Sequence, residues 1–392
     1  MGEVKDRDQR SKVRGQNPEE GNREESAARE FEEGPRSVLC LDIGSGTQDV
    51  LLHIPGEQPE NCPKFVLPSP ARVIAERLAA LTAARRAVWL YGDNMGGGFF
   101  RTAKAHLEQG LPLASHPEAA FSLGDNPDRV RALGVNLAET CPPGHVPLHL
   151  ADFDPGFWRT FLAAAGLDYP DLILAAAQDH GYHPDSSNRV GRFQLWRDFL
   201  LQAQGRPEAL VFADPPAQLT RLRTLKARIG AGLVADTGAA AVLGALFEPE
   251  VRQLQRTQGV CVVNVGNSHV LGFLLFQDQI LGVYEQHSNR SREDVLADLD
   301  LFRHGLLTHQ QVMDQYGHGC LTLYLPPEAG AFAPTYVLGP RRALLRDTGA
   351  VFLAPGGDMM LAGCFGLLQG WEFTRPRSLI RAADQDRIIT LP

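Results

Sequence analysis

Residues 41–53 read LDIGSGTQDVLLH and residues 262–285 read VVNVGNSHVLGFLLFQDQILGVYE, and these two stretches decide the fold. In each, an apolar strand ends in one polar side chain, Asp42 in the first stretch and Asn264 in the second. Small residues follow as a tight turn, and an apolar strand returns. One glycine-rich hairpin need bind nothing. Two related hairpins, one in each half of the chain, point to a ligand held between two lobes.

Both turns expose backbone N–H groups that can point at phosphate oxygens. Thr47 and Ser268 add hydroxyl donors. Asp42 is expected to hold Mg²⁺, partly through water, because Mg²⁺ bound to a nucleotide keeps much of its hydration shell. The residues expected to hold phosphate are Gly44, Gly46 and Thr47 in the first turn and Asn264, Gly266, Asn267 and Ser268 in the second.

Strands and helices alternate along the rest of the chain, which favours an α/β fold with much of the sheet covered on both faces. Strands are expected at 87–91, 171–177 and 210–212, and helices at 71–84, 193–204 and 216–229. Residues 351–353 and 359–361 also read as strands, and a final helix is expected to begin near residue 365.

Composition narrows the class of protein. The 392 residues carry a net charge of -8, which argues against a nucleic-acid surface and a polybasic membrane anchor. No apolar run approaches the ~20 residues that span a bilayer, so we expect a soluble, cytoplasmic protein. The six cysteines are scattered, as expected in a reducing compartment, at positions 40, 62, 141, 261, 320 and 364.

Three regions are expected along the chain. Residues 1–36 are almost all polar or charged and are predicted to be a disordered tail. Residues 37–230 are assigned to a first lobe that carries the first hairpin, and residues 231–392 to a second lobe that carries the other.

The hairpins resemble the two phosphate motifs of the actin, heat-shock-chaperone and sugar-kinase ATPase superfamily. Residues 234–244, an acidic residue before an alanine-rich helix, resemble its connecting motif, and Asp236 matches the residue that reaches Mg²⁺. The resemblance implies two ribonuclease-H-like lobes with ATP and Mg²⁺ between them. The adenosine motif is matched by two segments, 360–366 with Gly363 and 353–357, and pattern alone does not separate them.

Within the superfamily, the chain most resembles an uncharacterised prokaryotic branch, some members of which are labelled as related to the pyruvate formate-lyase-activating enzyme. That label implies a radical-generating iron–sulfur enzyme, which needs a C-x-x-x-C-x-x-C ligand set. The six cysteine positions contain no such set.

Hydrolysis or transfer of phosphate would need a carboxylate base, and the sequence offers two candidates. The second phosphate motif often begins with Asp, whereas here it begins with Asn264, which cannot act as a carboxylate base. Asp236 is the first candidate for that role, and Asp93 is the second. The alternative for Asp236 is the N-cap of its helix.

Two loops that follow strands are candidate substrate contacts. Tyr91 to Gly98 contains Gly96 and Gly97 and either approaches a substrate closely or is a flexible turn. Asp179, His180 and His183 either contact substrate, bind a metal, or belong to a solvated loop. His269 is interpreted as a packed strand histidine.

The leading functional hypothesis is an ATP-dependent phosphotransferase or ATPase acting on an unknown small molecule or protein partner. The main alternative is a non-catalytic nucleotide sensor or enzyme-assembly factor, which Asn264 favours. A third is a metal-assisted hydrolase with its metal at His180 and His183.

Overall fold

The computed structural model describes residues 35–375, so the predicted tail at 1–36 lies, but for its last two residues, outside the described residues. Contacts between residues separate a compact unit that begins at Ser37 from the residues before it. This is the position at which the sequence changes from charged to apolar.

The first sheet has six strands in the order β3-β2-β1-β8-β10-β9. β1, β2 and β3 form an antiparallel meander, and β8 and β10 run parallel to β1. A short antiparallel strand closes the edge. The strands are β1 (Val38–Ile43), β2 (Thr47–His53), β3 (Lys64–Pro68), β8 (Leu172–Ala177), β10 (Val234–Ala235) and β9 (Val211–Phe212).

The second sheet repeats this plan in the order β14-β13-β12-β11-β15-β16. β11 begins an antiparallel meander with β12 and β13, and it pairs with the parallel strand β15 on its other side. The repeated strand order is that of two ribonuclease-H-like lobes, so the predicted α/β fold class is confirmed. The strands are β11 (Val260–Val265), β12 (His269–Phe276), β13 (Gln279–His287), β14 (Gly319–Thr322), β15 (Thr335–Leu338) and β16 (Val351–Phe352).

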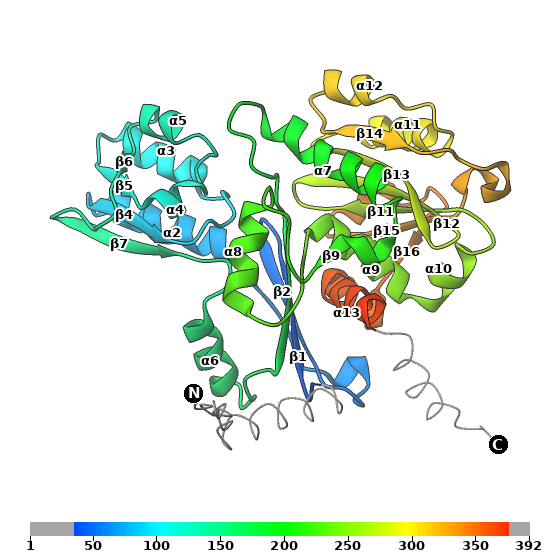
Figure 1. Ribbon diagram of the computed structural model, residues 1–392, viewed down its shortest axis with the longest axis horizontal. Coiled ribbons are helices and arrows are strands. Elements are labelled where there is room, and N and C mark those ends of the chain that lie inside the picture. Colours follow the sequence, from blue (N-terminus) through cyan, green and yellow to red (C-terminus); the bar gives the residue numbers. More distant parts are fainter. Residues whose placement is uncertain (1–34, 376–392) are drawn as a thin grey trace, which may run out of the picture. The chain divides into compact units, whose positions relative to one another are not determined.

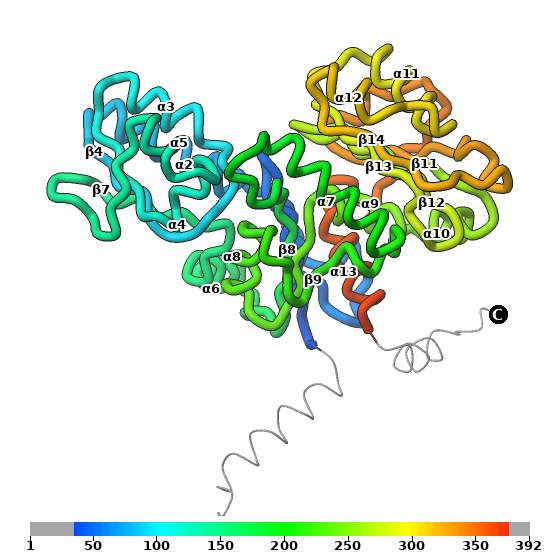
Figure 2. The backbone as a smooth tube through the Cα atoms, turned by 45° about the horizontal axis from the view of Figure 1, so that its top comes forward, coloured from blue at the N-terminus to red at the C-terminus, as the bar shows by residue number. Residues whose placement is uncertain are grey.

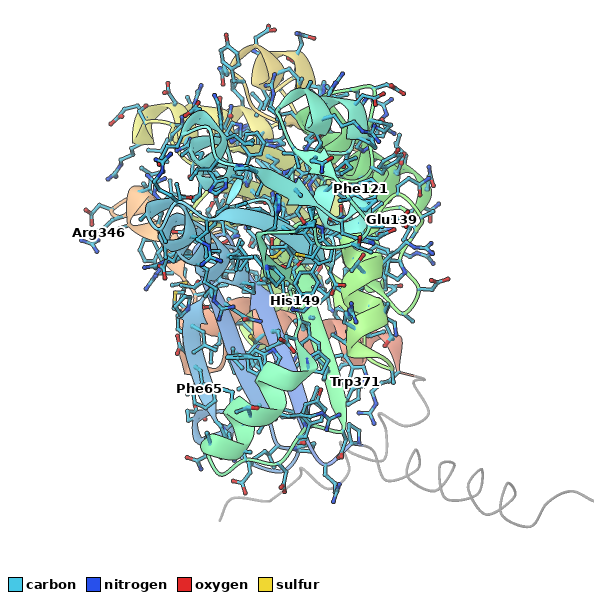
Figure 3. All side chains as sticks on the ribbon, turned by 90° about the vertical axis from the view of Figure 1, so that its left-hand side faces the viewer. Phe65, Phe121, Glu139, His149, Arg346 and Trp371 are labelled. Atoms are coloured by element: carbon cyan, nitrogen blue, oxygen red, sulfur yellow. The ribbon has the colours of Figure 1, made fainter. Side chains whose placement is uncertain are left out.

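Both faces of the first sheet are buried, which explains the unbroken apolar run in β1. Side chains alternate between the faces of a strand. Val38 and Cys40 therefore enter a core that also contains side chains of the second sheet, while Leu39 and Leu41 enter a separate core. The separate core is covered by α6 (Pro155–Ala164) and α8 (Thr220–Ile229). Figure 3 shows α6 across the strands, and its Phe161 meets the labelled Phe65 of β3 at 5.0 Å between ring centroids.

Two helices fill the core shared by the sheets, α9 (Thr237–Phe247) and α13 (Ala362–Thr374) (Figure 1). Their backbones approach closely because glycines stand where they cross. A Cβ at Gly366 would strike the carbonyl of Ala240, and one at Gly244 would strike that of Ala362. The alanine-rich pattern in the sequence therefore reflects close helix packing.

A third, four-stranded sheet lies between β3 and β8 in sequence, and sequence patterns did not reveal it. Its strands are all parallel, in the order β6-β5-β4-β7, and it has a core of its own. The expected strand at 87–91 is present as β4 but belongs to this sheet. Figure 2 shows this segment in cyan. It comprises α2 (Pro70–Ala83), β4 (Ala87–Gly92), α3 (Phe100–Glu108), β5 (Leu113–Ser115), α4 (Pro117–Ala120), α5 (Pro127–Ala132), β6 (Asn136–Leu137) and β7 (His145–Leu150).

One expected strand is wrong. Met359–Leu361 forms a 3₁₀ turn, because the Asp358 side chain accepts a hydrogen bond from the Met360 N–H and caps it. The remaining helices are α7 (Asn188–Gln202), α10 (Pro249–Leu254), α11 (Arg292–Arg303) and α12 (His309–Asp314).

The division between lobes at residues 230 and 231 stays a prediction. The strand that follows it, β10, pairs with β8 and so belongs to the first sheet. Within residues 35–375, no helix combines the length and the apolar character that crossing a membrane requires.

Candidate functional site

The two hairpins meet at a cleft of about 480 Å³. Asp42 lies two residues after Cys40 in β1, and Asn264 lies two residues after Val262 in β11. Because alternate residues of a strand face the same side, both polar side chains lie on the sheet faces that share a core. At the tips, Ser45 Oγ lies 3.0 Å from Ser268 Oγ, which joins turns 223 residues apart in sequence. The cleft therefore opens where both strands end in polar residues.

Most of the predicted site residues line this cleft, although their roles stay predictions. Gly46 does not line it but faces the second turn, since a Cβ there would lie 3.2 Å from Asn267 Nδ2. Asp93, Asp236 and His183 lie outside the lining. The predicted residues that line it are Asp42, Gly44, Thr47, Gly96, Gly97, Asp179, His180, Asn264, Gly266, Asn267, Ser268 and Gly363.

A pair of carboxylates stands at the base of the first hairpin. Asp42 lies directly opposite Asp49 in the antiparallel register, so both side chains project from the same face, and both line the cleft. Oδ1 of each is buried without a hydrogen-bond partner. Sequence analysis missed Asp49, although counting the hairpin register back from the turn would have found it.

Burial and nearby negative charges make both carboxylates hard to ionise. The pKa of Asp42 is raised well above its ordinary value by burial, then by the charges of Asp49 and Asp236. Burial also raises the pKa of Asp49 to about 7, against a hydrogen bond from Thr47, with Asp358 adding to the rise. A divalent cation would remove both penalties, so this pair fits Mg²⁺.

Gly363 lies beside the same carboxylate. A Cβ at Gly363 would strike Oδ2 of Asp42, so the start of α13 closes over the carboxylate only because this residue is glycine. Gly363 lines the cleft, and its contact with adenosine stays a prediction. Met359 and Met360 also line the cleft, whereas none of residues 353–357 does.

A glycine turn that sequence patterns missed follows β15. Gly339 and Pro340 line the cleft. Gly339 has φ +95°, and a Cβ there would lie 2.6 Å from Asn264 Oδ1, so the turn needs glycine both for its conformation and for its close approach. It follows the strand parallel to β11, where a ligand commonly binds in an α/β sheet.

Asp236 does not fit its predicted role as an Mg²⁺ partner or base. Its Oδ1 accepts hydrogen bonds from Gly238 N (2.8 Å) and Arg192 Nη2 (2.7 Å). Its Oδ2 accepts from Asp179 N (3.1 Å) and Arg192 Nη1 (2.6 Å). Four donors occupy both oxygens, so the alternative interpretation, an N-cap of α9, matches the geometry.

Arg192 connects this cap to the second sheet. Its Nε donates to both oxygens of Glu285 on β13, at 3.2 and 3.1 Å, and Trp196 Nε1 donates to Glu285 Oε2 at 2.7 Å. Burial opposes ionisation of Glu285, but Arg192 and nearby histidines hold its pKa at about 2. The charged triad Asp236–Arg192–Glu285 thus ties α9 and α7 to β13.

The other predicted carboxylates are also occupied. Asp93 forms a two-point ion pair with Arg228, at 2.8 and 2.5 Å, which does not fit a free base. Asp179 accepts from Gly181 N (2.8 Å) and Leu222 N (3.0 Å), so it stabilises its own loop. In both residues the carboxylate serves the fold.

The glycine loop has a packing reason for two of its glycines. A Cβ at Gly96 would lie 2.8 Å from a guanidinium nitrogen of Arg221, and one at Gly97 would lie 2.7 Å from the carbonyl of Ser122. Arg221 in turn forms a two-point ion pair with Asp152, at 2.6 and 2.8 Å. The loop is therefore held against the wall of the cleft by specific contacts.

His180 and His183 have different surroundings. His183 N donates to Asp125 Oδ2 (2.8 Å) and its ring lies against Gly191, outside the cleft lining. His180 lines the cleft, and burial first, then Arg192, lowers its pKa to about 4. A metal held by both histidines stays a prediction.

Residues 95–344, more than half of the chain, match the family described as "Putative pyruvate format-lyase activating enzyme (DUF1786)". This confirms the predicted branch. No curated protein matches the chain.

Solved structures with a similar arrangement include a protein of Bacteroides thetaiotaomicron with an actin-like ATPase fold and unknown function. It has 9% identity, a TM-score of 0.33 and coverage of 86% of this chain and 97% of that one. The ethanolamine utilization protein EutJ of Carboxydothermus hydrogenoformans has 11% identity, a TM-score of 0.28 and coverage of 86% and 90%. MreB 5 of Spiroplasma citri bound to AMPPNP has 8% identity, a TM-score of 0.29 and coverage of 90% and 98%. At such scores, the actin-like fold rests on the repeated strand order rather than on these similarities.

Proposed function

The chain belongs to the DUF1786 family, and we propose that it binds ATP with Mg²⁺ in the cleft between its two hairpins. The observation that carries this proposal is the meeting of the two turns at Ser45 and Ser268, at a cleft also lined by Asp42, whose buried Oδ1 has no hydrogen-bond partner. The polyphosphate would accept hydrogen bonds from the backbone of both turns. Entry of a phosphate would separate the two serine hydroxyls.

Mg²⁺ has a specific place in this proposal. Asp42 and Asp49 would hold the ion, largely through its bound waters, and it would neutralise the phosphates. The two arginines that line the cleft, Arg192 and Arg221, are already committed to carboxylates, and no lysine is among the described lining residues. Phosphate charge is therefore best balanced by the cation.

The purine would lie between two segments that line the cleft, Gly339 and Pro340 after β15, and Met359 and Met360 before α13. Methionine side chains and a glycine turn offer the apolar and backbone surface that suits a flat base. Between the two adenosine segments that the sequence leaves open, 360–366 is favoured because its first residue lines the cleft and 353–357 does not.

We favour a nucleotide-dependent switch over a phosphotransferase. Asp236, Asp93, Asp152 and Asp179 all engage arginines or backbone N–H groups, and Asn264 cannot accept a proton as a base. A switch needs only differential binding of ATP and ADP. ATP hydrolysis or transfer to a small molecule or protein is the second candidate, with Asp49 as the remaining carboxylate of suitable pKa.

Radical chemistry of the kind named in the family description does not fit the cysteines. Five of the six are buried, and Cys40 and Cys364 are packed in the apolar core shared by the sheets. Burial raises the pKa of both thiols, whereas an iron–sulfur cluster needs several convergent thiolates. The described cysteines offer no such set, and no step is assigned to a cluster.

Isothermal titration calorimetry with ATP, with and without Mg²⁺, tests the proposal. Binding should require Mg²⁺, and Asp42→Asn should remove that requirement together with most of the affinity. Asp168→Asn, at an exposed position on the loop after α6, is the matched control. Absence of binding to the parent protein at millimolar ATP and Mg²⁺ would refute the proposal. A hydrolysis assay then separates the candidates: steady turnover that Asp49→Asn abolishes would favour the enzyme.

A further inference from the structure

Three histidines converge at one end of the second sheet. His269 begins β12 and lies directly opposite His287, the last residue of β13. His318 comes immediately before β14, and its N–H donates to the Glu285 carbonyl at 3.0 Å, which sets it beside the same strand. One nitrogen of each ring lies within 4.8 Å of the others, and ring centroids are 4.8 to 5.2 Å apart.

We propose that His269, His287 and His318 bind a divalent transition-metal ion, with Zn²⁺ as the preferred occupant. Three imidazoles are the ligand set of tetrahedral zinc sites that keep a position open for water or substrate. Zinc–nitrogen bonds of about 2.0–2.1 Å place ligand nitrogens roughly 3.4 Å apart, which small side-chain rotations can reach from the observed spacing. Among the described residues, this is the one group of three or more potential ligands so closely spaced.

A buried atom without a partner independently indicates a ligand. His318 is 2% exposed, and its Nδ1 is buried without a hydrogen-bond partner. An unpaired polar atom inside a protein carries a desolvation cost that a partner removes. A metal ion at this cluster would be that partner.

A carboxylate lies near the cluster. Glu285 is on the same strand as His287, two residues before it, and is paired with Arg192.

An outer partner holds one of the three rings. Gln178, immediately after β8, places its side-chain amide nitrogen Nε2 3.1 Å from Nδ1 of His269. With the amide turned so that its oxygen faces the ring, Gln178 accepts the Nδ1–H and leaves Nε2 of His269 free for the metal. Gln178 belongs to the first lobe, so the site includes a contact between the lobes.

The open coordination position faces the cleft. His269 and His180 both line the cleft, and the His180 ring centroid lies 6.5 Å from those of His269 and His318. A bound ion would therefore sit behind the second phosphate turn, with its fourth position toward His180. The site is separate from the Asp42–Asp49 pair, which offers only oxygen ligands of the kind Mg²⁺ prefers.

Metal binding is tested on the full chain, free of any polyhistidine tag, stripped with a chelator and titrated with Co²⁺ in the absence of nucleotide and Mg²⁺. We expect one Co²⁺ per chain with the visible d–d absorption of a tetrahedral site, displaced by one equivalent of Zn²⁺. His287→Ala and His318→Gln should each abolish the absorption. His304→Asn, which changes an exposed histidine at the end of α11, should leave it unchanged.

Gln178→Ala tests the outer partner, with an expected loss of Zn²⁺ affinity of about 10- to 100-fold. Circular dichroism and thermal unfolding of each metal-free variant establish that it is folded. Absence of the absorption in the folded parent protein, or its persistence in both histidine variants, would overturn the proposal. Neither result depends on ATP, so failure here leaves the nucleotide proposal standing.

Discussion

Replacing Asp49 by Asn should stabilise the metal-free protein at neutral pH. Asp49 is 8% exposed, and its pKa is raised from 3.8 to about 7, first by burial. Below pH 3.8, Asp49 is protonated in both the folded and unfolded chains and costs nothing. Between pH 3.8 and 7, the unfolded chain releases a proton that the folded chain keeps, so the free energy of unfolding falls as pH rises.

The size of the effect follows from the same numbers. A pKa that rises from 3.8 to about 7 corresponds to a loss of about 4 kcal/mol of stability at pH 7 and above. Asn has nearly the same shape and can still accept the hydrogen bond of Thr47, but it cannot ionise. Asp49→Asn should therefore raise the free energy of unfolding by up to about 4 kcal/mol at pH 7.5, with little effect at pH 4.

Urea unfolding between pH 4 and pH 8, in chelator and without nucleotide, measures this difference, with Asp168→Asn as the control. Addition of Mg²⁺ with ATP should then stabilise the parent protein and have a much smaller effect on Asp49→Asn. A variant less stable than the parent at pH 7.5, or a difference that does not change with pH, would refute the assignment of Asp49 as a strained carboxylate of the cation site.

Three further variants test the other contacts. Arg192→Ala should cost about 3–5 kcal/mol in urea unfolding because it leaves the buried carboxylates of Asp236 and Glu285 without a compensating positive charge; an effect below 1 kcal/mol would contradict a structural triad. Asp236→Asn should lower stability as well, since Asn caps α9 but cannot neutralise Arg192, and unchanged stability with lost turnover would restore the catalytic assignment. Gly363→Ala should push against Asp42 and weaken Mg²⁺-dependent ATP binding in calorimetry, and unchanged binding would place the cation elsewhere.

The hairpins were predictable because their signals are local. β1 and β11 are apolar but for one residue because both of their faces are buried, and that polar residue is the next to last before a glycine turn. Register in an antiparallel hairpin follows from the turn, so even the opposition of Asp42 to Asp49 was within reach of the sequence. The N-cap alternative for Asp236 was equally local.

The four-stranded sheet and the glycine turn at Gly339 were not predictable, because their signals are not local. β5 has three residues, β6 has two and β15 has four. Strands this short do not show a recognisable alternation of apolar and polar residues. Gly339 resembles any glycine after a short apolar run until its strand is seen to pair with β11. Short parallel strands can be recognised only by their pairing with strands that are distant in the chain.

The sequence by itself determined the two glycine-rich hairpins and the α/β class, because strand alternation and glycine turns act over a few residues. Only the tertiary structure decided which carboxylates are free. Arg192 reaches Asp236 across 44 positions and Glu285 across 93, and Arg228 reaches Asp93 across 135. The tertiary structure also places His318 beside His269 and His287. The partners of a buried group are set by chain packing rather than by its neighbours in sequence.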